Sequence, residues 1–150
     1  MRLVFTKRAG RNDELAIHGP DGAPQVISCP KQGIIPHDLV HYAVESVLHH
    51  RGFLSLVADG RTLAFTTTGG ESEETAERLV EVFQAEMWGS RVADADLLDT
   101  YVHACACRGH SAFPLAIAEV SAIRARLDDL TSRWERVRLN GSLSLDFRPA

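Results

Sequence analysis

The chain has 150 residues, of which 45% are hydrophobic and 24% charged, and its formal net charge is −4 at pH 7. These values are typical of one globular domain with a real core and argue against global disorder. The sequence has no run of 18 or more apolar residues, which excludes a transmembrane helix, and the acidic balance gives no overall electrostatic reason to bind nucleic acid.

The N-terminus and the cysteines indicate the compartment. The first residues, MRLVFT, hold only three consecutive apolar residues before charged ones follow, too few for the core of a signal peptide. Three cysteines are an odd number for a disulfide framework. We therefore expect a cytoplasmic protein whose cysteines are reduced thiols.

The N-terminal part of the chain predicts an antiparallel meander of two or three strands. Residues 2–6 and 25–29 are rich in β-forming side chains, and residues 14–18 alternate between polar and apolar. Between the last two segments, GPDGAP at residues 19–24 combines residue types that favour tight turns.

An amphipathic helix is predicted from His37 onwards. Pro36 suits the first helical turn, where its missing N–H is not needed, and Gly52 is a candidate stop. The apolar residues between them recur with the 3.6-residue period of a helix: Leu39, Val40, Ala43, Val44, Val47 and Leu48.

The segment after Gly52 allows two predictions. We favour a second helical segment, FLSLVADG, followed by a loop. The alternative is a hairpin in which residues 53–57 and 62–68 pair around Asp59-Gly60, a favourable turn pair.

Three further helices are predicted in the second half of the chain. The first follows Gly69-Gly70, carries acidic residues in its first turn and ends before Gly89. The second is capped by Asp94 and ends at Gly109. The third covers about residues 116–137 and has the most regular apolar pattern in the chain.

The apolar residues of this last helix form a heptad-like seam at spacings of 3, 4, 3, 4 and 3: Val120, Ile123, Leu127, Leu130, Trp134 and Val137. The favoured interpretation is packing against another helix of the same chain. The alternative is the interface of a homodimer, although about two and a half heptads are short for a coiled coil.

The chain closes with an Asn-Gly turn and a strand that places Leu143, Leu145 and Phe147 on one face. Such a strand needs a partner, which the N-terminal meander can supply. We therefore expect a single α+β domain over residues 1–150, with a small, mainly antiparallel sheet packed against about four helices.

The helix at His37 carries the most specific functional signal. At about 100° per residue, His37, Asp38, His41 and Glu45 share one flank beside the apolar stripe. Two imidazoles one turn apart can bind one divalent metal, and a nearby carboxylate can join or orient them. These four residues are our candidate ligands for zinc or another divalent metal.

A structural role for the same residues is also consistent with the sequence. Asp38 near a helix N-terminus is favoured by the helix dipole, and His41 and Glu45 form an ordinary i, i+4 pair. The spelling His-Asp-Leu-Val-His resembles the H-E-x-x-H helix of zinc metalloproteases. Asp38 stands where that family has its glutamate base, so the resemblance does not assign a peptidase.

A second cluster, HACACRGH, spans residues 103–110. In a helix, Cys105 and Cys107 point about 200° apart and cannot reach one ion. The favoured interpretation makes Cys105 a core residue and pairs His103 with Asp99. The alternative is that one stripe of this helix completes the His37/His41 site: Asp96, Asp99, His103 and Cys107.

Two stretches, PKQGIIPHDLVHYAVE and RWERVRLNGSLSLDF, are similar to those of small uncharacterised bacterial proteins with a Pro-His-Asp-x-x-His-x-x-Val-Glu core. The resemblance implies a bacterial origin and a shared fold, and it implies no reaction.

Two functions therefore compete. The first is a structural or protein-interaction module, with a homodimer formed through the last helix or an edge strand. The second is a divalent-metal-binding domain, hydrolytic if the metal activates water, whose small-molecule substrate cannot be named. A nucleic-acid contact through the arginine-rich last third is a weaker third reading, because acidic residues are interspersed there.

Overall fold

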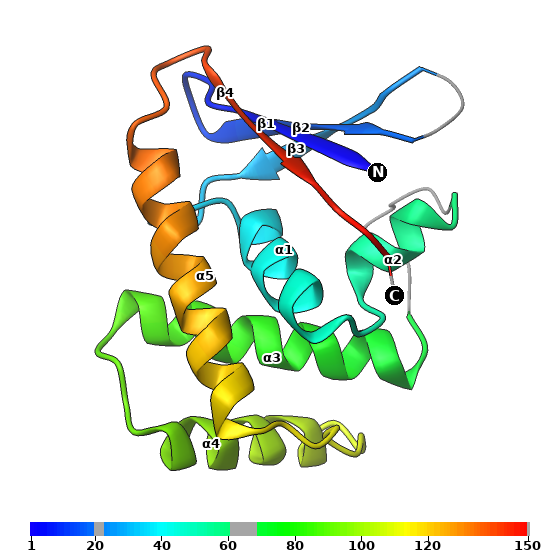
Figure 1. Cartoon of the computed structure of the whole chain (residues 1–150), viewed down its shortest axis with the longest axis vertical. Coiled ribbons are helices and arrows are strands. Elements are labelled where there is room, and N and C mark those ends of the chain that lie inside the picture. The colour runs from blue at the N-terminus through cyan, green and yellow to red at the C-terminus, as the bar shows by residue number, and fades with distance from the viewer. Residues whose placement is uncertain (20–22, 61–68, 150) are drawn as a thin grey trace.

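The computed structural model describes residues 1–19, 23–60 and 69–149. A four-stranded sheet lies at one end of the molecule, with the helices beneath it (Figure 1). The sheet has the order β3-β2-β1-β4 and every pair in it is antiparallel. Its strands are β1 (Arg2–Thr6), β2 (Asn12–His18), β3 (Gln25–Pro30) and β4 (Ser142–Asp146).

The alternation of side chains along the strands makes one face of the sheet apolar. Leu3 lies opposite Ile17 of β2 and Leu145 of β4, and all three side chains are buried. Phe5 is paired in the same way with Leu15 and Leu143. The helices cover this face, because only there can the apolar side chains leave water.

In the described ranges, five helices follow the meander before the chain returns to the sheet. They are α1 (His37–Leu48), α2 (Phe53–Ala58), α3 (Glu71–Trp88), α4 (Asp94–Ala106) and α5 (Ile117–Glu135). α1 lies directly beneath the sheet, α3 crosses beneath α1, and α4 is farthest from the sheet (Figure 1). α1 is therefore an inner element, and all of its residues from Asp38 to Glu45 are buried.

The predicted fold class, a small α+β domain with a mainly antiparallel sheet, is confirmed. The meander has three strands, and β4 pairs with β1. The favoured helix after Gly52 is confirmed as α2, so the hairpin prediction for residues 53–57 is wrong. Residues 62–68, the other half of that hairpin, lie outside the described residues.

The heptad-like seam of α5 packs inside the chain. Val120, Ile123, Leu127, Leu130 and Trp134 are all buried in the core, and α5 packs mainly against α1. The prediction of intramolecular packing is confirmed, and this seam is not available as the contact between two copies.

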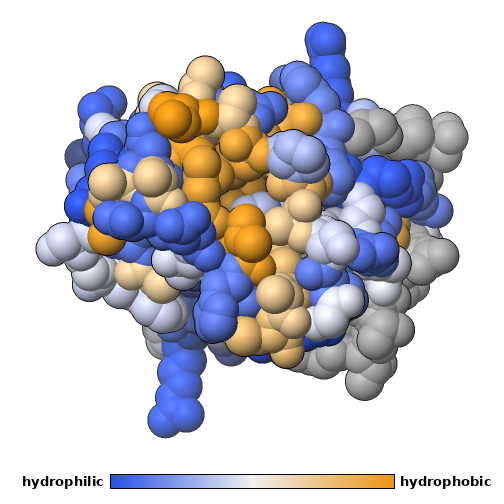
Figure 2. Space-filling model, turned by 90° about the horizontal axis from the view of Figure 1, so that it is seen from below, coloured by the Kyte–Doolittle hydropathy of each residue, from blue (hydrophilic) through white to orange (hydrophobic). Residues whose placement is uncertain are grey.

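Apolar side chains are exposed on the side of the molecule below α3 (Figure 2). Seen from below, apolar atoms gather around a hollow on the face that includes α4 (Figure 2). Val102 on α4 and Ile117 at the start of α5 are more than half exposed. Within the described ranges, no helix combines the length and apolarity needed to cross a bilayer.

Candidate metal centre

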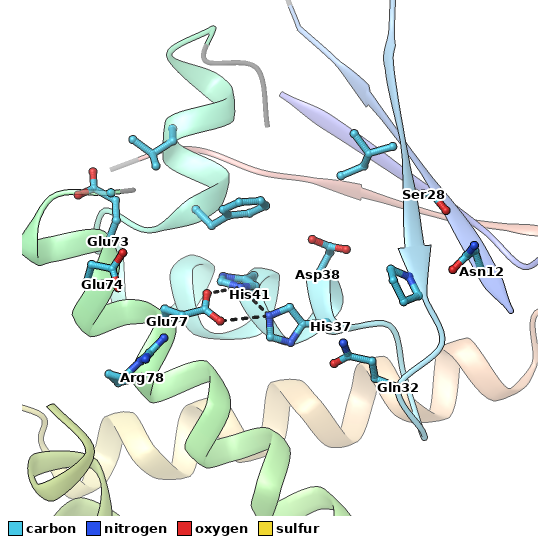
Figure 3. Close-up of a pocket in the computed structure, with 15 residues that line it drawn as sticks. Asn12, Ser28, Gln32, His37, Asp38, His41, Glu73, Glu74, Glu77 and Arg78 are labelled. Atoms are coloured by element: carbon cyan, nitrogen blue, oxygen red, sulfur yellow. Dashed lines mark hydrogen bonds and ion pairs between the residues drawn. The ribbon is translucent and has the colours of Figure 1, made fainter. Parts of the chain in front are cut away.

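A cleft of about 690 Å³ opens beside α1, between β3 and the helices α2 and α3. His37, Asp38 and His41 line it from α1, and Glu77 and Arg78 line it from α3 (Figure 3). The strongest sequence candidates therefore line a cleft large enough for a small molecule.

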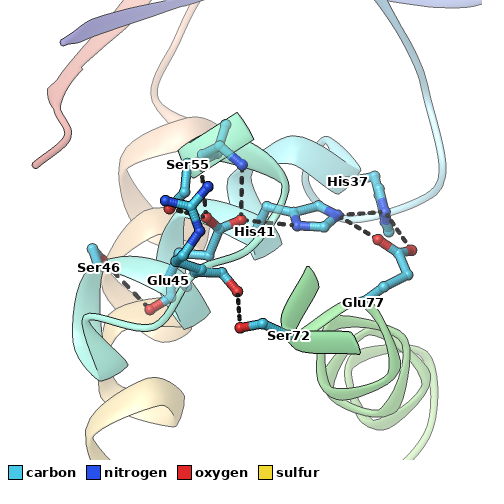
Figure 4. Close-up of polar contacts among 10 residues, drawn as sticks. His37, His41, Glu45, Ser46, Ser55, Ser72 and Glu77 are labelled. Atoms are coloured by element: carbon cyan, nitrogen blue, oxygen red, sulfur yellow. Dashed lines mark hydrogen bonds and ion pairs between the residues drawn. The ribbon is translucent and has the colours of Figure 1, made fainter. Parts of the chain in front are cut away.

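Three side chains direct nitrogen or oxygen atoms at one point in this cleft. His41 Nε2 lies 3.1 Å from His37 Nε2 and 3.0 Å from Glu77 Oε2. His37 Nε2 lies 3.4 Å from Glu77 Oε1 (Figure 4). The donor atoms of the three residues all lie within 4.8 Å of one another.

Helix geometry brings the two histidines of this cluster together, and the packing of α3 against α1 adds Glu77. The two histidines are one turn apart on α1, so their rings project from the same side. Glu77 comes from the second turn of α3, which packs across α1 through buried residues such as Val80 and Phe83. The third member of the cluster thus depends on a contact between helices.

Hydrogen bonds hold the other nitrogen of each ring. His37 Nδ1 lies 2.7 Å from Gln84 Oε1, and Gln84 donates its own Nε2–H to Gln32. Gln84 is thereby oriented to accept from the His37 Nδ1–H, and His37 Nε2 faces the cluster. Partners of this kind orient metal-ligating histidines in proteins.

Glu45 holds His41 from the far side of its ring. Its Oε1 lies 3.3 Å from His41 Nδ1, and its carboxylate also accepts from the backbone N–H groups of Leu54 and Ser55 at the start of α2. The backbone at Gly52 lies close to the Glu45 carboxylate, because a Cβ added at Gly52 would lie 2.5 Å from Glu45 Cδ. Glu45 therefore orients His41 and does not share the point where the two Nε2 atoms meet.

Asp38 lines the same cleft but has a different partner. It is buried, and its Oδ2 accepts a hydrogen bond from the thiol of Cys29 on β3, with Sγ 2.9 Å away. Burial, together with the Asp38 charge and hydrogen bond, raises the pKa of Cys29 well above its usual range, so the thiol stays protonated as a donor. The structure thus brings His37 and His41 together and directs Glu45 and Asp38 elsewhere.

The charges of the cluster depend on one another. Burial lowers the pKa of His41, but its contacts with the Glu45 and Glu77 carboxylates outweigh burial and raise it to about 10. Burial likewise raises the pKa of Glu77, and the two histidines outweigh it and hold that pKa well below its usual range. With no metal bound, His41 is a buried cation at neutral pH, and an ion binding at its Nε2 has to displace that proton.

The helix over residues 94–108 does not complete the site. α4 packs against α3 and α5, away from the sheet. The four residues of its predicted ligand stripe are all exposed: Asp96, Asp99, His103 and Cys107. His103 contacts Cys107, with Nε2 3.4 Å from Sγ, where the sequence predicted a pair with Asp99. Cys105 is buried in the core, as predicted.

Glu77 was missed because it is one of several acidic residues in the first half of α3. A signal was nevertheless present in the sequence. Glu77 and Gln84 are seven residues apart, which places them two turns apart on one face, beside the buried Val80. Polar residues at the edge of an apolar stripe suggest that the neighbouring helix offers them partners.

Comparisons with protein-family models, with curated proteins and with solved structures found no match to the chain. The relation to the bacterial group that shares the Pro36–Glu45 motif therefore stays a prediction.

Proposed function

We propose that the chain binds a divalent cation of the zinc type through His37, His41 and Glu77. The convergence of their three donor atoms, with closest contacts of 3.0–3.4 Å, supports this proposal. In a tetrahedral zinc site with bonds of about 2.0–2.2 Å, neighbouring donors lie roughly 3.3–3.6 Å apart. Without a cation, hydrogen bonds alone join the two Nε2 atoms and the Glu77 carboxylate.

We further propose that the bound ion promotes hydrolysis. Two histidines and one glutamate are a donor set found in catalytic zinc sites, where the fourth position holds water. A cation held by His37, His41 and Glu77 would supply an activated water for attack on an electrophilic carbon or phosphorus of the substrate. The water proton passes through a carboxylate to the leaving group, and Asp38 lines the cleft beside the first ligand.

Metal analysis of protein purified without a histidine tag tests the binding proposal. We expect one Zn²⁺ or Mn²⁺ per chain after equilibrium dialysis, and a higher melting temperature when the ion is present. His41→Gln and Glu77→Gln should abolish stoichiometric binding. Glu74→Gln is the matched control, because Glu74 lines the same cleft from α3 but is not one of the three donors.

Two results would contradict the proposal. One is the absence of stoichiometric metal together with an unchanged melting temperature. The other is equal metal binding by Glu77→Gln and Glu74→Gln. The hydrolytic part is tested with chromogenic carboxylate and phosphate esters, whose turnover should require the added metal and disappear in Glu77→Gln.

A second candidate function, a protein-interaction module, is supported by the apolar face in Figure 2. Exposed apolar side chains such as Val102 and Ile117 leave contacts that a partner can cover. A homodimer through this face or through the edge strand β3 is the form we propose. Sedimentation at micromolar concentration tests it, and a strictly monomeric chain would rule out the homodimer.

A further inference from the structure

Arg78 is a buried arginine whose hydrogen-bonding capacity is largely unused. Only 4% of its surface is exposed, and it follows Glu77 directly on α3. Its Nη2 lies 3.1 Å from Glu81 Oε1, whereas Nε and Nη1 are buried with no hydrogen-bond partner among the described residues. Three N–H bonds of the guanidinium thus have no acceptor.

Buried donors without an acceptor are rare, because a buried N–H that has lost water and gained no partner is destabilising. The single ion pair of Arg78 is weak compensation, since the Glu81 side chain is 45% exposed. One way to satisfy such a group is an acceptor on a bound molecule. A planar, permanently charged guanidinium is well suited to carboxylate and phosphate oxygens.

The position of Arg78 indicates where that acceptor comes from. Arg78 lines the same cleft as His37, His41 and Glu77, and Figure 3 shows it beside Glu77 on α3. Two acidic groups of this wall are already engaged, because Glu73 pairs with Arg51 and Glu77 faces the two histidines. Asp38 and Glu74 also line the cleft, and a bound divalent ion offsets their charge and adds its attraction for an anion to that of Arg78.

We propose that Arg78 binds an oxyanion group, carboxylate or phosphate, of the molecule that the metal centre hydrolyses. This inference rests on the proposed function, and it names the class of substrate: a small anionic molecule that spans the metal and Arg78. Arg78 binds the substrate by its charge and its N–H groups, and it takes no part in ligating the metal.

Calorimetric titration of the zinc-loaded protein with inorganic phosphate and with succinate tests the proposal. We expect at least one of these probes to bind, and the tighter one identifies the kind of oxyanion. Arg78→Met should weaken this binding about tenfold or more, since it removes the charge-assisted hydrogen bonds. Arg126→Met, on α5 away from the cleft, should leave it unchanged.

Zinc binding by each variant distinguishes a misfolded protein from failure of the metal proposal and from failure of the Arg78 proposal. Arg78→Met must still bind one zinc ion per chain, which also shows that it folds. If it does not fold, Arg78→Lys keeps the buried charge but lacks the planar set of donors, and it should also bind the probe more weakly. A wild-type chain without zinc would overturn the proposed function and this inference with it. Zinc-loaded protein that binds neither probe, or binds them equally well without Arg78, would overturn this inference alone.

Discussion

His41 is the residue of the site whose protonation depends most on its neighbours. Its ring is almost fully buried, and it lies between two carboxylates from different helices, Glu45 on its own helix and Glu77 on α3. A buried imidazole is usually neutral, but here the two carboxylates favour the charged form. The residue therefore links the protonation of the site to the stability of the metal-free fold.

The raised pKa of His41 predicts how that stability depends on pH. The folded-state pKa of about 10 lies above the ordinary value of 6.5, so the stabilisation is complete below pH 6.5 and is lost as the pH rises toward 10. Between pH 6.5 and 8.5 the free energy of unfolding should fall by about 2 kcal/mol from this group alone. Urea denaturation with a chelator present measures this change.

His41→Gln is the comparison that isolates the effect. The variant should lose this pH dependence over the same range, whatever its absolute stability. Unfolded cysteines begin to ionise at the upper end of this range, but Cys29 is the same in both proteins, so its contribution cancels in the comparison. Equal slopes in the two proteins would show that His41 does not carry the proton.

At the scale of elements, α1 is an inner helix that carries buried polar side chains. An amphipathic helix normally turns its polar face to water, but α1 lies between the sheet and α3. Each of its buried charged or imidazole side chains therefore has a partner on another element: Asp38 on β3, His41 on α3, and Glu45 at the start of α2. These contacts join the elements around the cleft.

Glu45→Gln tests the link between α1 and α2. The variant keeps the shape of the side chain but removes the charge that accepts the N–H groups of Leu54 and Ser55. We expect a loss of about 1–3 kcal/mol in the free energy of unfolding. Zinc affinity should fall about 10- to 100-fold, because His41 loses the partner that orients it.

The control is Glu135→Gln, which makes the same chemical change at an exposed residue at the end of α5. Urea denaturation and competition with a chelator give the two quantities. If Glu45→Gln matched this control in both, Glu45 would be neither a helix contact nor a positioning residue.

At the scale of the whole molecule, the two ends of the chain meet in the sheet. β1 lies between β2 and β4, and Met1 and Phe147 bond through their backbones in both directions. All five helices lie in the chain between β3 and β4. Helix packing and closure of the sheet are therefore coupled.

Truncation of the C-terminus tests this coupling. A chain ending at Gly141 loses the buried Leu143, Leu145 and Phe147 and uncovers the edge of β1. Burial of three such side chains contributes about 5–9 kcal/mol, comparable to the whole stability of a small domain. We expect the truncated chain to lose cooperative thermal unfolding, as measured by circular dichroism.

A chain ending at Phe147 is the matched control, because it removes only residues 148–150 and keeps the three apolar side chains. It should unfold cooperatively near the wild-type temperature. Cooperative unfolding of the shorter chain would show that β4 is not an integral part of the fold.

Most elements could be predicted because their signals are local. The period of the apolar residues indicated α1 and α5, and turn residues and alternation indicated the strands. The pairing of His37 and His41 was equally accessible, since residues four apart on a helix share a face wherever the helix lies. Asp38 and Glu45 show the limit, because a shared flank does not say which partner each side chain meets.

By itself, the sequence determined the fold class, the buried stripe of α5 and the two histidines that face one cleft. Only the tertiary structure decided that Glu77 joins them, that Glu45 faces the other side of His41, and that Nε and Nη1 of Arg78 are buried with no acceptor in the described part of the chain. The physical reason is the range of the interactions. Helix geometry sets spacing within about two turns, whereas the packing of α3 across α1 depends on the apolar surfaces of the whole chain.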